Sequence, residues 1–153
     1  MALATFDKTN LPKVVIKFTE NRLTDDNFRQ FITTWDECDL DNSPYNFYFD
    51  FTENSMSGVK LKYIVGLASF LKRKKKQSTK YLQYSVINVA NKKTLLLLLR
   101  MVFNLSAPIA PVYIIADNSP EYITTVYEAI NNNTQTPTQT PKQMPKGVIK
   151  FFP

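Results

Sequence analysis

The sequence contains no histidine, only one cysteine and only three glycines. Without histidine the chain lacks the commonest general base, metal ligand and pH switch. A single cysteine cannot form an internal disulfide, and no histidine is present to complete a zinc site with it or to activate it as a nucleophile. The three glycines are too few and too widely spaced for a glycine-rich phosphate-binding loop. These absences predict a protein that is not an enzyme and that needs neither a cofactor nor a metal.

Long apolar runs are also missing. The longest apolar stretch is Leu95–Leu99, continued after one arginine by Met101–Phe103, and it falls well short of the ~20 residues that a membrane-spanning helix needs. Residues 1–10 hold no basic segment followed by an apolar one, so no signal peptide is expected. We therefore expect a cytoplasmic or virion protein that is neither secreted nor transmembrane.

Strand and helix signals alternate along the chain. Alternating or β-branched apolar residues predict strands at 2–6, 14–18, 47–51, 82–86 and 112–115. Apolar residues at helical spacing predict four helices. One begins after Thr24, one begins at Leu61, one ends at Phe103 and one begins at Pro120. The predicted order β-β-α-β-α-β-α-β-α indicates an α/β fold with a mixed, mainly parallel sheet. Because several strands alternate, we expect helices mostly on one face of that sheet.

The composition changes near residue 131. Residues 1–131 have the pattern of one α/β domain, whereas residues 132–153 are rich in proline, threonine and glutamine and end in an apolar segment. We expect 132–153 to be an extended tail whose apolar residues anchor it on a neighbouring molecule. These anchor residues are Val148, Ile149, Phe151 and Phe152.

The predicted domain resembles the STAS domain, the fold of bacterial anti-sigma-factor antagonists and of sulfate-transporter tails. The resemblance runs from about Ala2 to Ile130. It depends on an N-terminal hairpin, a strand ending in FYFDF, a loop ending in Ser57-Gly58 that leads directly into a long helix, and the later strand YLQYSVINV. It implies a module that binds other proteins without catalysing a reaction.

The resemblance also implies a position for the binding loop. In the family this loop typically reads Asp-Ser-Ser-Gly, and in the antagonists the serine before the glycine is phosphorylated. Here Ser57 and Gly58 match, whereas Ser55 and Met56 replace the first two residues. Ser57 is thus a possible phosphoacceptor, although a serine that only caps the following helix is the more ordinary interpretation. We expect a protein partner to contact Ser55, Met56, Gly58 and, on the leucine-rich helix, Leu95 and Leu99.

Charge is concentrated in two runs of opposite sign. The net charge is +6, and most of the excess lies in Lys72, Arg73, Lys74, Lys75, Lys76 and Lys80. This run has no interleaved aromatic residues, so we expect only non-specific anion binding, to nucleic acid or an anionic membrane, that weakens steeply with salt. The acidic run at 36–41, DECDLD, lacks the glycine and terminal glutamate of a calcium-binding loop and is expected to be solvated.

Three functions remain open from the sequence. The first is a STAS-like interaction module that docks a protein through the Ser57 loop and its neighbouring helices. The second is a structural component of a large assembly, such as a minor capsid or virion protein, that is held to neighbouring subunits by its C-terminal arm. The third is an anionic lipid or nucleic-acid binder that uses the basic run 72–80. None of the three involves a small-molecule substrate.

Overall fold

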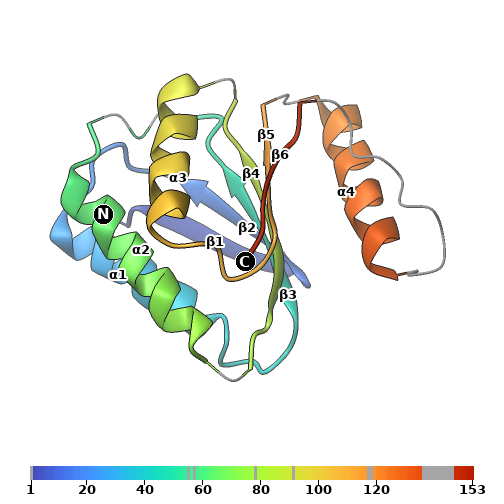
Figure 1. Ribbon diagram of the computed structural model, residues 1–153, viewed down its shortest axis with the longest axis horizontal. Coiled ribbons are helices and arrows are strands. Elements are labelled where there is room, and N and C mark those ends of the chain that lie inside the picture. The colour runs from blue at the N-terminus through green and yellow to red at the C-terminus, as the bar shows by residue number, and fades with distance from the viewer. Residues whose placement is uncertain are drawn as a thin grey trace.

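The computed structural model describes residues 2–54, 56, 58–77, 79–90, 92–116, 119–135 and 147–153. They form a single six-stranded sheet with four helices around it (Figure 1). Ser55, expected to contact a partner, and Ser57, the possible phosphoacceptor, lie outside the described residues.

The sheet is mixed and its strands follow the order of the chain. They are β1 (Ala4–Asn10), β2 (Lys13–Phe18), β3 (Tyr45–Asp50), β4 (Leu82–Asn88), β5 (Val112–Ile115) and β6 (Ile149–Phe151). Strands β2 to β5 pair in parallel, whereas β1 and β6 run antiparallel to their neighbours at the two edges. The predicted mixed, mainly parallel sheet is confirmed.

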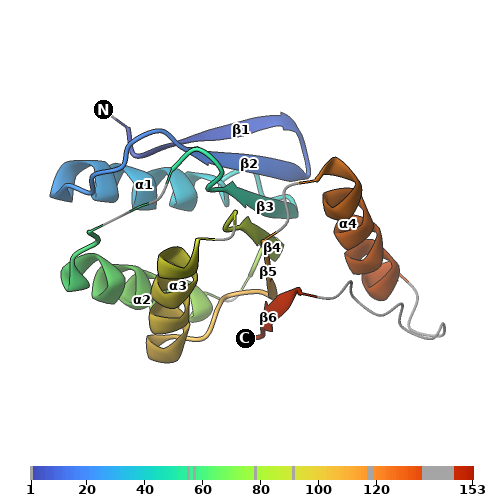
Figure 2. The ribbon, with the colours of Figure 1, turned by 90° about the horizontal axis from the view of Figure 1, so that it is seen from above.

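Three of the four helices cover one face of this sheet. The helices are α1 (Asp25–Glu37), α2 (Leu61–Lys75), α3 (Lys93–Leu105) and α4 (Pro120–Gln135). Figure 2 shows α1, α2 and α3 together on one side of the strands and α4 alone on the other. The expectation that the helices lie mostly on one face is therefore also confirmed.

Local sequence signals explain where the helices begin. Thr24 caps α1: its side chain accepts a hydrogen bond from the backbone N–H of Asn27, and the Asn27 side chain accepts one from the N–H of Thr24. This reciprocal pair satisfies two of the N–H groups that a helix start leaves free. Ser119 accepts a hydrogen bond from the N–H of Tyr122 at the start of α4, as the Ser-Pro-Glu sequence predicts.

The alternation within the central strands supplies a core on each face. On the α1–α3 face, Phe47 and Phe49 of β3 are buried with Trp35 of α1, whose ring is 5.1 Å from that of Phe47. On the opposite face, Tyr48 belongs to a second, smaller apolar cluster, together with Val126 of α4. Helix α4 therefore covers a row of tyrosines and aliphatic residues on β3, β4 and β5.

The C-terminal segment departs from the expectation of a separate arm. Helix α4 continues to Gln135, beyond the boundary proposed at residue 131, and Ile149–Phe151 pair with β5 as strand β6. Ile149 and Phe151 are half-buried against the main core, and the ring of Phe151 is 4.8 Å from that of Phe103. The apolar end thus packs on its own domain, because the edge of β5 offers both hydrogen-bond partners and an apolar surface. The residues between, 136–146, lie outside the described part of the chain.

We expect Phe151→Ala to lower the stability of the isolated protein by about 1–2 kcal/mol, which corresponds to a fall in Tm of roughly 3–6 °C. The reason is that Phe151 is half-buried and stacks near Phe103, so truncation removes apolar contact area. Phe152→Ala is the matched control, since Phe152 is 60% exposed and should change Tm by less than about 1 °C. Thermal unfolding followed by circular dichroism measures both. Equal Tm values for Phe151→Ala and the unchanged protein would show that β6 is detached in solution.

Candidate functional site: the strand-end loops and the outer faces of α2 and α3

The loops that follow the parallel strands lie at one edge of the sheet. The loop after β3, residues 51–60, leads into α2, and the loop after β4, residues 89–92, leads into α3. Both loops follow the carboxyl ends of parallel strands, and the loop singled out by the sequence is one of them. We call these two segments the strand-end loops.

Lys92 ties the two strand-end loops together. Its ammonium nitrogen donates hydrogen bonds to the carbonyl oxygens of Phe51, of Thr52 at 3.2 Å and of Asn54 at 2.8 Å. Three acceptors match the three donors of an ammonium group. The start of α3 is thereby fixed to the loop that precedes α2. Sequence reasoning missed this residue, because its acceptors are backbone atoms about 40 positions away.

In both strand-end loops an asparagine side chain accepts a hydrogen bond from the backbone N–H two residues later. Asn54 is buried, and its side-chain oxygen accepts a hydrogen bond from the N–H of Met56 at 3.0 Å. Asn88 is fully buried, and its side-chain oxygen accepts one from the N–H of Ala90, also at 3.0 Å. Met56 and Ala90 both have positive φ, 46° and 48°, a conformation that side chains other than glycine seldom adopt. The side-chain hydrogen bond two residues back holds each loop in this shape.

The predicted loop residues occupy different positions. Met56 is buried in the main core, which corrects the expectation that it contacts a partner, whereas Gly58, with φ of 70°, is exposed. On α3, Leu95 is buried and Leu99 is half-buried, which corrects the expectation that Leu95 meets a partner. The sequence did not show which side of α3 faces the core, because the positions from Leu95 to Leu99 are all apolar.

Large apolar side chains are instead exposed on the outer faces of α2 and α3. These two helices pack against each other, as Figure 2 also shows. The exposed side chains are Leu61, Val65, Leu97, Met101 and Leu105. Leu61 is 63% exposed and Leu97 is 59% exposed. Leu97, Met101 and Leu105 recur every four residues, so they form one stripe along α3. We call these five residues the outer apolar patch.

Helices α2 and α3 contain no acidic residue, whereas each carries basic ones. On the outer side, Lys72, Lys93 and Arg100 are exposed. An apolar patch on two helices whose own charged residues are all basic suits a surface that is apolar and negatively charged. This face is thus the most distinctive surface among the described residues.

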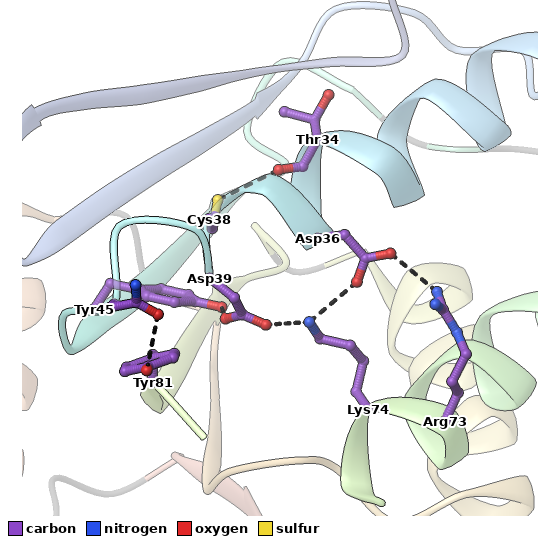
Figure 3. Close-up of polar contacts among 9 residues, drawn as sticks. Thr34, Asp36, Cys38, Asp39, Tyr45, Arg73, Lys74 and Tyr81 are labelled. Atoms are coloured by element: carbon purple, nitrogen blue, oxygen red, sulfur yellow. Dashed lines mark hydrogen bonds and ion pairs between the residues drawn. The ribbon is translucent and has the colours of Figure 1, made fainter. Parts of the chain in front are cut away.

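The basic run is only partly free, because it pairs with the acidic run (Figure 3). Lys74 is only 4% exposed, and its ammonium contacts a carboxylate oxygen of Asp36 at 3.1 Å and one of Asp39. Arg73 donates to Asp36 at 3.0 Å, and the hydroxyl of Tyr45 donates to Asp39 at 2.6 Å. Lys74 is therefore no anion-binding residue, and this part of the acidic run is not simply solvated. The two runs clamp the C-terminal ends of α1 and α2 together.

Beneath the loops and helices, the main core contains an apolar cavity of about 150 Å³, which we call the core cavity. Phe49 and Ile87 line it from the sheet, Leu67 and Leu98 from the helices, and Met56 from a strand-end loop.

The one cysteine is not poised for reaction. Cys38 is buried, and its thiol donates a weak hydrogen bond to the carbonyl of Thr34 at 3.5 Å. Burial raises the pKa of the Cys38 thiol to about 11, so the thiolate is scarce near neutral pH. Burial, reinforced by the hydrogen bond to Asp39, also raises the pKa of Tyr45.

In the described part of the chain no three histidine, cysteine, aspartate or glutamate side chains are grouped so that they would hold a metal ion. The helices within the same ranges are all too short or too polar to cross a bilayer. No protein-family model, curated protein or solved structure matches this chain. The STAS assignment therefore depends on the resemblance in element order and loop sequence alone.

We expect Lys74→Met to destabilise the protein by about 1–3 kcal/mol. The substitution keeps the apolar stem but leaves Asp36 and Asp39 without their shared cation, and their partial exposure limits the cost. Lys72→Met, two positions away and exposed, should change the free energy of unfolding by less than about 0.5 kcal/mol. Urea denaturation of both variants measures the difference. If both substitutions had the same small effect, the clamp between α1 and α2 would contribute nothing to stability.

We expect the protein to lose stability as pH rises above about 9. The folded pKa of Cys38 is raised to about 11, above the ordinary value of 9.0, so its contribution is complete below pH 9 and disappears as pH approaches 11. Cys38→Ala should therefore reduce the loss between pH 8 and pH 11 by up to about 2 kcal/mol. Urea denaturation of both chains at the two pH values gives this difference. An identical pH dependence with and without the thiol would contradict it.

Proposed function

We propose that the chain is a non-enzymatic, STAS-like interaction module that docks a protein partner through the strand-end loops and the outer apolar patch. The observation that carries the proposal is the exposure of five large apolar side chains on two adjacent helices of one small domain. Leu97, Met101 and Leu105 lie along one side of α3, and an exposed apolar stripe of this kind is typical of interaction sites in soluble proteins. The rigid tie between the loops through Lys92 supports it, because a pre-formed surface loses less conformational entropy on binding.

The partner surface that fits is apolar at its centre and acidic at its rim. Leucines and a methionine form the patch, and the exposed charges of α2 and α3 are all positive. An amphipathic helix with acidic residues beside an apolar stripe meets both requirements. This chemistry also accounts for the excess of lysine and arginine without invoking nucleic acid.

A protein partner fits this face better than a lipid surface. Membrane-binding helices commonly place tryptophan or phenylalanine at the interface, and Phe152, just after β6, is the one aromatic residue among the exposed large apolar side chains of the described ranges. Several cations of α2 are also already paired, since Lys62 contacts Asp25 and Arg73 contacts Asp36. Fewer unpaired cations therefore remain on α2 than the basic run in the sequence suggests.

The assembly alternative is weakened by the position of the C-terminal segment. Strand β6 pairs with β5 of its own sheet, so the arm is not needed elsewhere to bury Ile149 and Phe151. A neighbouring copy remains one possible occupant of the outer apolar patch, and self-association of the pure chain would reveal it.

The double variant Leu97→Glu, Met101→Glu should weaken partner binding at least tenfold and leave Tm nearly unchanged, because both side chains are exposed. Leu40→Glu is the matched control, since Leu40 is 73% exposed but lies in the turn after α1. Partners captured by the unchanged chain from the source cells are purified, and titration calorimetry gives their affinities for each variant. Analytical ultracentrifugation of the chain alone and sedimentation with phosphatidylserine vesicles accompany the titrations.

The proposal is supported if a purified partner binds the Leu97→Glu, Met101→Glu chain more weakly than it binds the unchanged chain and the Leu40→Glu chain. We call the double variant the α3 variant. A partner bound equally by all three chains contradicts it. Binding to vesicles alone, or self-association alone that the α3 variant abolishes, would replace the protein partner with a membrane or with a second copy.

A further inference from the structure

The core cavity is larger than the gaps found in ordinary packing. Protein interiors are packed about as densely as organic crystals, and they hold few voids larger than a water molecule. At about 150 Å³ the core cavity matches in volume an engineered apolar cavity that stays dry and takes up benzene or xenon. A void of this size at the centre of a small domain has the dimensions of a binding site.

The lining of the core cavity defines the ligand class. None of its side chains is charged, and its polar members are few. Ser85 contributes a hydroxyl from β4, while the hydroxyl of Tyr63 is already occupied in donating to Asp25 at 2.9 Å. A carboxylate or a phosphate inside would have no counter-charge and would lose its hydration without compensation. Trp35, which also lines the cavity, has a buried indole N–H without a hydrogen-bond partner in the described part of the chain. The ligand must therefore be neutral and mainly apolar.

We propose that the core cavity is a binding site for a neutral hydrocarbon group of about six to eight carbon atoms. Two sources supply such a group: a small free molecule, or the end of an alkyl chain whose polar head stays outside. Each would replace empty space with contacts to aliphatic and aromatic side chains.

Occupancy of the core cavity would also reach the strand-end loop. Met56 lines the cavity, is buried and holds a positive φ that the side chain of Asn54 stabilises. A bound hydrocarbon adds contacts to the Met56 side chain in its present position. The ligand would thus favour the loop conformation that the structure displays, and binding should be visible at this residue.

The test uses the full chain, with p-xylene and xenon as free probes and octyl glucoside, below its micelle concentration, as the chain-end probe. We expect p-xylene at about ten times its dissociation constant to raise Tm by roughly 3 °C or more. Nuclear Overhauser effects should connect its protons to the methyl groups of Met56 and of the lining leucines. Xenon should compete with p-xylene.

Two variants of equal chemistry locate the site. Leu67→Phe enlarges a lining side chain and should weaken p-xylene binding at least tenfold, while Ile123→Phe, on the α4 face, should change it less than twofold. The direct contacts to Met56 in the unchanged chain keep the test decisive even if Leu67→Phe does not fold. Octyl glucoside that displaces p-xylene identifies chain ends as ligands, whereas failure to displace it restricts the site to free molecules.

Absence of contacts from p-xylene to the lining methyl groups at saturation would overturn the proposal, as would equal binding by the Leu67→Phe chain. The partner-docking hypothesis is separable, because Leu97 and Met101 are exposed and do not line the core cavity. Their glutamate variants should bind p-xylene like the unchanged chain.

Discussion

Strand β3 must be covered on both of its faces, and most of the architecture depends on this requirement. Phe47 and Phe49 face one side and Tyr48 faces the other, and all three are buried. Water on either side would leave an aromatic surface exposed, so the fold needs a helical layer on each face. Helices α1 to α3 supply the first layer and α4 supplies the second (Figure 2). The inner faces of α2 and α3 pack into the core, so only their outer faces remain exposed.

Much of the fold was predictable because its signals are local. Alternation in FYFDF, the cap at Thr24 and the Ser-Pro-Glu helix start each depend on neighbouring residues, and the order of elements follows from them. Strand β6 was missed for a physical reason. A three-residue strand gains its stability from the edge of β5 and from Phe103, which the surrounding proline- and threonine-rich composition does not reveal. Apolar residues with a β-branched isoleucine were the only available signal.

The position of the candidate site in the fold was predictable from the sequence, but the side chains exposed there were not. The loop after β3 was singled out because Ser57 and Gly58 resemble the end of the STAS loop sequence. The sequence did not show which leucines of α3 face outward, because a run that is apolar throughout has no helical periodicity. The clamp at Lys74 had a readable signal. The acidic run begins in the last turn of α1 and the basic run ends α2, and helices that connect successive parallel strands run in the same direction, so opposite charges at their C-terminal ends were a signal for contact.

The order of the strands has a consequence for synthesis on the ribosome. Each strand pairs with the one made just before it, so the sheet can grow one strand at a time as the chain emerges. The last interval is the longest, by a small margin. From Ile115 at the end of β5 to Ile149 at the start of β6 the ribosome adds 149 − 115 = 34 residues, against 82 − 50 = 32 from Asp50 to Leu82 between β3 and β4. At ~5–20 residues per second this takes roughly 2–7 s. Throughout that interval the outer edge of β5 has unpaired backbone groups, so the nascent chain is open to wrong pairing there until β6 has been made.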